Sequence, residues 1–285
     1  MTHVILHQHV SGHCLGIAAT TERGAPWRVR TYPAGWTLIE HPTAGRLLFD
    51  TGYAPRVQRA MARWPGALYG LVTPVRLRPG QDAVNQLAQR GVQADDIAEV
   101  IVSHLHADHV GGLLDFPRAR LRLDRRAWQR TRAWIGVAAV RRGVLRELLP
   151  DDLEARAGWL DFRAAPEGLT DFGEVADVCG DGSVWAVPVP GHAPGMIALI
   201  CRTVPDAPLT GSGEGLTVLG ADTAWSGRAL RAGESAPAVG RLAHWNAREE
   251  ARSARTLRGW LGHHPHAALV LSHERSPQTA GPGTP

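Results

Sequence analysis

The chain has 285 residues, of which 44% are hydrophobic and 20% are charged, and this balance is typical of a globular protein with one large domain or two small ones. The net charge is +4 and all 31 basic residues are arginines, so the sequence excludes Schiff-base chemistry on a lysine and the lysine of a nucleotide-binding P-loop. Because the arginines are spread along the chain among acidic residues, we expect no nucleic-acid partner.

The apolar segments and the cysteines both favour a cytoplasmic protein without a membrane partner. The longest apolar runs, such as Ala267–Leu271 and Met196–Ile200, are far too short to span a bilayer. The N-terminal residues lack the basic and apolar segments of a secretion signal. Cys14, Cys179 and Cys201 are scattered, which argues against a disulfide framework and against a zinc knuckle.

The first third of the chain predicts three strands and one helix around a long loop. Short apolar runs predict strands at Val4–Leu6, Thr37–Glu40 and Arg46–Phe49. Residues 53–80 contain four prolines and are expected to form a loop. The spacing of apolar residues predicts a helix over Asp82–Arg90, which Gly91 would end.

The remainder of the chain mixes strands with helical segments. The β-branched run Val100–Val102 predicts a buried strand that leads directly into a histidine cluster. The arginine-rich segment Asp124–Trp159 has a mostly helical pattern, and Asn246–Leu261 predicts an amphipathic helix. Further strands are predicted at Val184–Val189, Met196–Cys201, Leu216–Leu219 and Ala267–Leu271. Residues 276–285 are rich in Pro, Gly and Thr, which predicts a disordered tail.

Five predicted strands lead into a residue that can bind a metal or act as a carboxylate. These residues are Asp50, His104, His192, Asp222 and His273. Strand ends at one edge of a sheet converge in space even when they are far apart in the sequence, and a rigid sheet then fixes the ligands while the loops admit the substrate.

The densest chemical signal is Ser103–Gly112, which holds three imidazoles and a carboxylate within six positions. Neutral imidazole and carboxylate are good ligands for zinc and similar ions. Two histidines spaced as His-x-His point towards one metal, and the adjacent Asp-His pair can serve a second. The alternative interpretation is a solvated loop, since the chain has 14 histidines. Histidines away from the strand ends, among them His9, His41 and His244, are expected to be solvated or hydrogen-bonded.

This decapeptide resembles the His-x-His-x-Asp-His signature of the metallo-β-lactamase superfamily. The resemblance extends to four further segments in the order of that family: Leu48–Gly52, Pro190–Gly195, Leu219–Asp222 and Leu271–His273. It implies an α/β fold of four layers, αββα, with the site at one edge of the two sheets. The expected domain covers residues 1–275 with a helical insertion at about 118–165, followed by a disordered tail at 276–285.

The resemblance also implies a set of metal ligands. His104, His106 and His192 would hold the first metal, and Asp108, His109 and His273 the second. Asp222 would bridge the two metals together with a hydroxide, which acts as the nucleophile. Asp108 and Asp222 are the catalytic candidates because either could pass a proton to the leaving group.

Two further expectations concern Asp50 and the identity of the metals. Asp50 is expected to orient a ligand histidine or to cap a turn. Zinc is the first expectation for the two divalent ions, with manganese, iron or cobalt as alternatives.

Residue identities narrow the subclass that the resemblance implies. His106 stands where the redox diiron branch has Glu, which favours hydrolysis, and His109 stands where many true β-lactamases have Arg. The motifs look closest to the N-acyl homoserine lactonase-like group, although Trp225 replaces the tyrosine of those enzymes. We therefore expect hydrolysis of a small ester or lactone. The alternatives are a phosphodiesterase, a thioester hydrolase of the glyoxalase II kind, and a non-catalytic metal-binding protein.

Aromatic residues near these motifs are the candidates for a substrate pocket. Trp64, Tyr69, Trp128 and Trp225 are predicted to line it, and the alternative is that they seal the core or a homodimer interface. The only other expected partner is a small-molecule substrate. The arginine-rich stretch Arg118–Arg156 could bind an anionic substrate, but its amphipathic pattern favours the solvated face of a helix.

Overall fold

A long antiparallel hairpin begins the first of two sheets in the computed structural model, which describes residues 2–234, 237 and 244–274. Strands β1 (Ile5–Ile17) and β2 (Val29–His41) form this hairpin, and β3 (Gly45–Phe49) pairs antiparallel with β2. Three parallel strands follow, and the complete order is β4-β1-β2-β3-β5-β6-β7. The remaining bounds are β4 Val75–Arg76, β5 Ile97–Ile101, β6 Arg120–Leu123 and β7 Ala157–Trp159.

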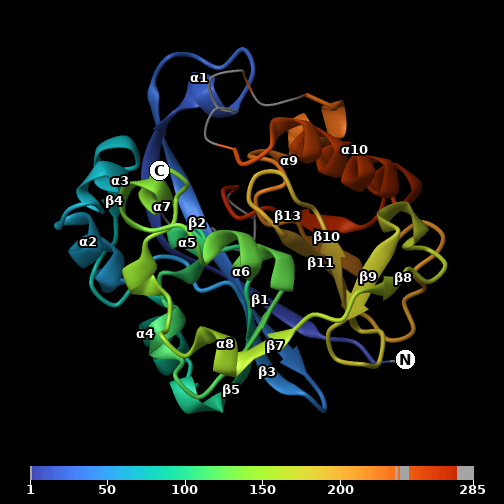
Figure 1. The fold of residues 1–285 in the computed structure, drawn as a ribbon. Coiled ribbons are helices and arrows are strands. Elements are labelled where there is room, and N and C mark those ends of the chain that lie inside the picture. Colours follow the sequence, from blue (N-terminus) through green and yellow to red (C-terminus); the bar gives the residue numbers. More distant parts are fainter. Residues whose placement is uncertain (1, 235–236, 238–243, 275–285) are drawn as a thin grey trace.

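The second sheet is built from the C-terminal half of the chain. Its order is β13-β12-β11-β10-β9-β8, and all its neighbours are antiparallel except β12 and β13. The bounds are β8 Arg163–Ala164, β9 Glu174–Asp177, β10 Val184–Pro188, β11 Ile197–Arg202, β12 Leu216–Leu219 and β13 Ala268–Val270. Figure 1 shows the two sheets with helices outside them.

Successive residues of the first sheet enter two different cores, because side chains alternate between the faces of a strand. Leu47 and Phe49 pack with the second sheet, whereas Leu48 between them packs beneath the helices. The same alternation separates Ile101 from Val100. The first sheet is therefore buried on both faces, as the predicted four-layer αββα fold requires.

Helices cover the outer faces of both sheets. Helix α10 lies over the second sheet, and its Trp260 is fully buried and donates a hydrogen bond to the Gly168 carbonyl at 2.7 Å. The helices are α1 Ala18–Thr21, α2 Pro55–Met61, α3 Ala67–Val72, α4 Ala83–Gln89, α5 Ala107–Val110, α6 Arg125–Thr131, α7 Gly136–Val140, α8 Leu153–Arg156, α9 Gly227–Ala232 and α10 Ala247–His263, with 3-10 turns at Ala94–Asp96, Leu113–Asp115, Arg146–Leu148 and Thr170–Phe172.

Several predicted segments differ from the structure. The strands predicted at Val4–Leu6 and Thr37–Glu40 are parts of the much longer β1 and β2. Residues 53–80 were expected to form a loop, but they contain α2, α3 and β4. Pro55 stands at the first position of α2, where its fixed φ and missing N–H suit a helix start. The expected insertion at about 118–165 is helical only in its middle, since its α6, α7 and α8 lie between β6 and β7 of the first sheet.

The remaining expectations concern the cysteines, the C-terminal tail and the apolar segments. The three cysteines are free thiols, as expected. The predicted tail, 276–285, lies outside the described residues. Among the residues that are described, no helix has the length and apolar character needed to cross a membrane.

Candidate metal centre

The ends of strands from both sheets meet at one edge of the molecule, as the sequence predicts. Asp50 follows β3, and His104 lies just beyond β5 in the first sheet. His192, Asp222 and His273 lie just beyond β10, β12 and β13 in the second. The one-turn helix α5 adds Asp108 and His109. The structure brings all seven predicted ligands into two adjoining groups.

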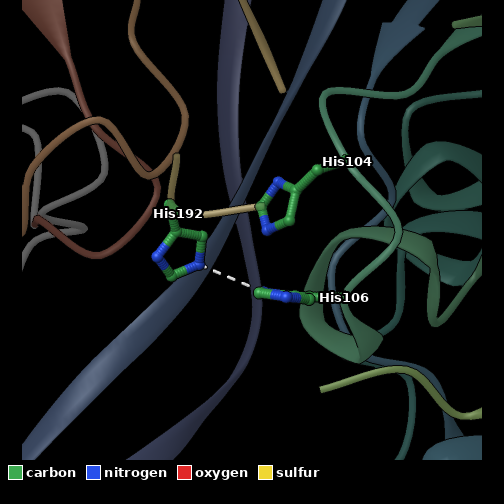
Figure 2. A group of neighbouring side chains, drawn as sticks. All are labelled: His104, His106 and His192. Atoms are coloured by element: carbon green, nitrogen blue, oxygen red, sulfur yellow. Dashed lines mark hydrogen bonds between the residues drawn. The ribbon is translucent and has the colours of Figure 1, made fainter. Parts of the chain in front are cut away.

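The first group consists of His104, His106 and His192 (Figure 2). One nitrogen from each ring lies within 4.8 Å of the other two. His192 Nε2 is 3.1 Å from His106 Nδ1, and the rings of His104 and His106 are 4.4 Å apart. His104 and His192 are buried and His106 is half-buried, so protein surrounds most of this first group.

Burial also sets the charge of this first group. It lowers the pKa of His106 to about 4 and holds the pKa values of His104 and His192 well below the ordinary value for histidine. The three imidazoles are therefore neutral at pH 7, which is the form that donates a lone pair to a cation.

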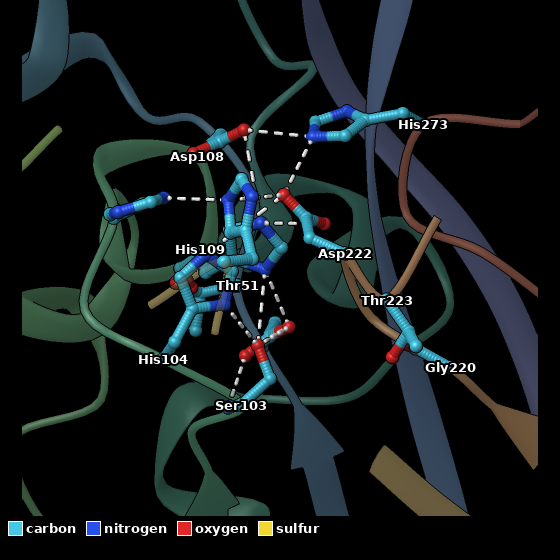
Figure 3. A network of polar contacts seen from close by, with 12 residues as sticks. Thr51, Ser103, His104, Asp108, His109, Gly220, Asp222, Thr223 and His273 are labelled. Carbon is cyan, nitrogen blue, oxygen red and sulfur yellow. Dashed lines mark hydrogen bonds and ion pairs between the residues drawn. The ribbon is translucent and has the colours of Figure 1, made fainter. Parts of the chain in front are cut away.

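The second group consists of Asp108, His109, Asp222 and His273, all of them buried (Figure 3). His273 Nε2 lies 3.3 Å from Asp108 Oδ2 and 3.0 Å from Asp222 Oδ2. Burial alone would lower the pKa values of His109 and His273, but the surrounding carboxylates outweigh it and raise both. In the same way, His273 and His109 outweigh the effect of burial and hold the pKa of Asp222 well below its usual range.

Asp222 lies between the two groups and contacts both. Its Oδ2 is 3.3 Å from His192 Nε2 and 3.9 Å from His104 Nε2 in the first group. Its Oδ1 is 3.2 Å from His109 Nε2 in the second group. The backbone turn that presents it includes Ala221 at a φ of 46°, a left-handed conformation that non-glycine residues rarely adopt.

Asp50 supports the site from behind. Its Oδ2 accepts hydrogen bonds from the Ser103 hydroxyl at 2.7 Å and from His109 Nδ1 at 2.7 Å, and its Oδ1 accepts one from the Ser103 N–H at 2.8 Å. Because Nδ1 of His109 donates a hydrogen bond to Asp50, Nε2 of the same ring points towards the other residues of the second group. His273 is oriented in the same manner, with Nδ1 donating to the Pro33 carbonyl at 2.8 Å. The contribution of Ser103 was not foreseen, although it stands inside the motif.

Trp64 and Trp128, two of the four predicted pocket residues, line neither the cavity beside the first group nor the one beside α9 and α10. Trp64 has 70% of its surface exposed because it stands in the turn between α2 and α3. Trp128 is buried and its indole N–H donates to Glu154 at 2.5 Å, so it serves packing.

Of the other two predicted residues, Tyr69 also lines neither cavity, and Trp225 borders one of them. Tyr69 is buried, with its hydroxyl 3.3 Å from that of Tyr53. Trp225 stacks on the His273 ring at 4.3 Å and borders a cavity of about 160 Å³ beside α9 and α10.

A cavity of about 370 Å³ adjoins the first group, and none of the four residues Trp64, Tyr69, Trp128 and Trp225 lines it. Trp245 and His244 border it although they are about fifty residues from His192 in the sequence. His244 was expected to be solvated or hydrogen-bonded, and its Nδ1 is hydrogen-bonded to the Glu250 carboxylate. The lining residues are His106, Trp134, Ala138, Arg141, Arg142, His192, Pro194, His244 and Trp245.

Comparisons with known proteins agree with this geometry. A sequence model of the metallo-beta-lactamase superfamily matches residues 31–203. The N-acyl homoserine lactonase AttM of Azorhizobium caulinodans is 30% identical over 180 residues, which cover 62% of each chain. The match thus spans less than two thirds of that relative.

Solved structures resemble the fold over nearly the whole chain. An N-acyl homoserine lactone hydrolase with N-hexanoyl-L-homoserine bound at its catalytic metal centre has a TM-score of 0.74 at 18% identity, covering 96% of this chain and 94% of that one. AidC, a dizinc quorum-quenching lactonase, has a TM-score of 0.64 at 14% identity, with 96% and 89% covered.

Proposed function

Because this chain belongs to the metallo-β-lactamase superfamily, we propose that it is a metal-dependent hydrolase of small esters or lactones that binds two divalent cations. The observation that carries the proposal is the position of Asp222. Its Oδ2 lies close to His104 and His192 of the first group and to His273 of the second, and its Oδ1 lies close to His109 of the second. The carboxylate therefore contacts both groups of donor atoms, as a carboxylate shared by two cations would. The negative charge of a shared carboxylate offsets the repulsion between two cations held close together.

The donor set fits divalent metals. His104 Nε2, His109 Nε2 and Asp222 Oδ1 are buried without a hydrogen-bond partner in the structure. Buried polar atoms of this kind are costly unless they find a partner, and a cation would provide one. His104, His106 and His192 would hold one ion, and Asp108, His109 and His273 the other, with Asp222 shared. Zinc is the first candidate, supported by the nitrogen and oxygen donors and by the dizinc relative AidC.

The bound cations would supply an activated water at neutral pH and polarise the carbonyl under attack. The protein's own residues would orient and protect that chemistry. Asp50 and the Pro33 carbonyl fix the rings of His109 and His273. Asp108 is the less enclosed of the two central carboxylates, with 8% of its surface exposed against 3% for Asp222. It is therefore placed to carry a proton between the reacting centre and the leaving group.

The substrate class is inferred from the cavity and from the relatives. A cavity of about 370 Å³ beside the first group accommodates a small molecule. The relatives named above are lactonases, and the product that one of them binds is an acyl homoserine. A small lactone or a carboxylic ester is accordingly the substrate that we propose.

A substrate panel tests the proposal on the metal-loaded protein. N-hexanoyl homoserine lactone and 4-nitrophenyl hexanoate should be hydrolysed, bis(4-nitrophenyl) phosphate and S-lactoylglutathione should be poor substrates, and a chelator should abolish the activity. Asp222→Ala serves as the inactive control, with circular dichroism to show that it folds. The proposal would be overturned if the phosphodiester or the thioester were hydrolysed in preference to the lactone and the 4-nitrophenyl ester. Activity that survives confirmed metal loss would also overturn it.

A further inference from the structure

The cavity beside the metal centre carries two arginines that the proposed hydrolysis does not use. Arg141 and Arg142 line it together with His106 and His192 of the first group. Both arginines are exposed, and among the described residues neither forms an ion pair with a carboxylate. A molecule bound in this cavity therefore meets the metal centre on one side and two unpaired guanidinium groups on another.

Other arginines of the same segment differ from these two. Five of them are paired with carboxylates, in the pairs Arg118–Asp95, Arg122–Glu99, Arg126–Asp124, Arg132–Glu154 and Arg156–Asp152. The expectation of a solvated helix face describes much of this segment but not its two arginines at the cavity. A pair of unneutralised cations at the mouth of a site attracts anions.

Two tryptophans hold the Arg142 guanidinium in place. It lies 4.7 Å from the ring centre of Trp134 and 5.5 Å from that of Trp245, and the two indole rings are 5.3 Å apart. Stacking on aromatic faces restricts the guanidinium without using its N–H groups. Those N–H donors remain available to a planar oxyanion, which a guanidinium binds through two parallel hydrogen bonds.

The segments that carry Arg142 and Trp245 are hydrogen-bonded to loops that carry candidate metal ligands. Gly143, which follows Arg142, accepts a hydrogen bond from the Ala107 N–H at 3.0 Å, and a Cβ at Gly143 would lie 2.9 Å from the His106 ring. Trp245 donates its backbone N–H to the His192 carbonyl at 3.0 Å. The Arg142 guanidinium is thus held at a fixed position relative to the first group.

We propose that Arg141 and Arg142 form a specificity site for a carboxylate on the substrate, separate from the bond that is hydrolysed, with Arg142 as the principal ligand. The inference rests on the proposed function and makes it more specific. The preferred substrate is an ester or lactone whose acyl part ends in a carboxylate. A neutral acyl chain of the same length lacks the group that these guanidinium groups bind.

A matched pair of esters tests the inference on the metal-loaded protein. The mono-4-nitrophenyl ester of adipic acid and 4-nitrophenyl hexanoate have acyl chains of equal length, and only the first ends in a carboxylate. The wild type should show the higher kcat/KM for the adipate ester, mainly through a lower KM. Arg142→Gln should reduce the ratio of the two kcat/KM values by about tenfold or more, as expected for a charge-assisted hydrogen bond, and Arg141→Gln should reduce it less.

The control variant is Arg130→Gln, because Arg130 is an exposed arginine on α6 that lines none of the described cavities. This variant should keep the wild-type ratio. Equal kcat/KM values for the two esters, or a ratio that Arg142→Gln and Arg130→Gln change alike, would overturn the inference while the hydrolase proposal stands.

Calorimetric binding of adipic acid monoamide, with hexanamide as the neutral match, gives a readout that does not depend on turnover. The monoamide should bind more tightly than hexanamide, and Arg142→Gln should weaken the binding of the monoamide by about tenfold. Binding that is lost in Arg142→Gln supports the carboxylate site even if neither ester is hydrolysed, an outcome in which only the proposed function fails. Monoamide binding that Arg142→Gln leaves unaltered would contradict the site.

Discussion

Asp50 is a buried carboxylate that would position the proposed metal ligand His109 from behind the site. It receives three hydrogen bonds, two from Ser103 and one from His109. Asp50→Asn keeps the shape of the side chain, but its amide group cannot accept all three. The imidazole of His109 then loses both its orientation and part of its basicity. We expect metal affinity to fall by roughly 10- to 100-fold, measured by competition with a chromogenic chelator.

The matched control is Asp95→Asn, since Asp95 is an exposed carboxylate that pairs with Arg118 at the surface. This variant should bind metal as the wild type does. Equal affinities in Asp50→Asn and Asp95→Asn would show that Asp50 only caps the turn after β3.

His9 offers a test of pH dependence away from the metal centre. It stacks on Trp36 at 4.4 Å, and its Nδ1 is hydrogen-bonded to Gln86. Burial is the largest cause that lowers its pKa from 6.5 to about 4, and the nearby Arg90 and His7 act in the same direction. Between these two values the unfolded chain binds a proton at this position and the folded chain does not.

The free energy of unfolding should therefore decrease as the pH falls from about 6.5 to about 4, because the unfolded state then binds more protons. His9→Phe retains a ring against Trp36 and removes the titration, so its stability should depend less on pH over this range. Urea unfolding at several pH values measures both slopes. An identical pH dependence in the variant would show that His9 is not held neutral by its burial.

At the scale of elements, the sequence predicts some strands closely and others only in part. Strand β5, which leads to His104, begins at Ile97 and not at the predicted Val100. Strands β3, β10, β11 and β12 are marked by apolar runs between turn residues, and they match their predicted positions to within one or two residues. The ends of β1 and β2 were missed because polar and half-buried residues occupy much of their length. The ends of β1 and β2 are specified by pairing with neighbouring strands more than by the hydrophobic pattern of their own sequence.

The ligands and their pocket were not equally predictable. Four of the proposed ligands lie within six consecutive residues at and before α5, so a short sequence motif was enough to predict them. A pocket wall is assembled from distant segments instead. Trp134 and Trp245 are in contact across more than a hundred residues of sequence, and no local pattern reports that contact. Trp64, by contrast, is aromatic and near α2 in the sequence but stands in solvent.

The turn at the end of α7 tests the contact between this element and the metal centre. Gly143 has a φ of 72°, and a Cβ there would lie 2.9 Å from His106. Gly143→Ala should destabilise the protein by about 1–2 kcal/mol through backbone strain alone, with a further loss from the clash. It should also weaken metal binding, because the His106 ring must move. Thermal unfolding and metal titration measure the two effects.

The paired control is Gly45→Ala. Gly45 has a φ of 79°, and no atom lies within 4 Å of the position that its Cβ would take. This variant has the same type of strain without a clash, so its metal affinity should remain that of the wild type. If both variants bind metal equally well, the packing of Gly143 does not position His106.

At the scale of the whole molecule, the centre exists only when the two sheets pack together. Asp50, His104, His106, Asp108 and His109 come from the first sheet and its loops, whereas His192, Asp222 and His273 come from the second. Neither sheet alone supplies both groups. Metal binding is therefore coupled to the folding of the entire sandwich, and bound metal should stabilise the folded chain.

The central claim is that this centre binds two divalent cations, and the most direct test is the number of metal ions per folded chain. Protein stripped with a chelator, reloaded with zinc or manganese and freed of excess metal is analysed by inductively coupled plasma mass spectrometry. The account predicts close to two ions per chain in the wild type and fewer in Asp222→Ala. A wild-type chain that retains one ion or none, with its fold intact, would contradict it.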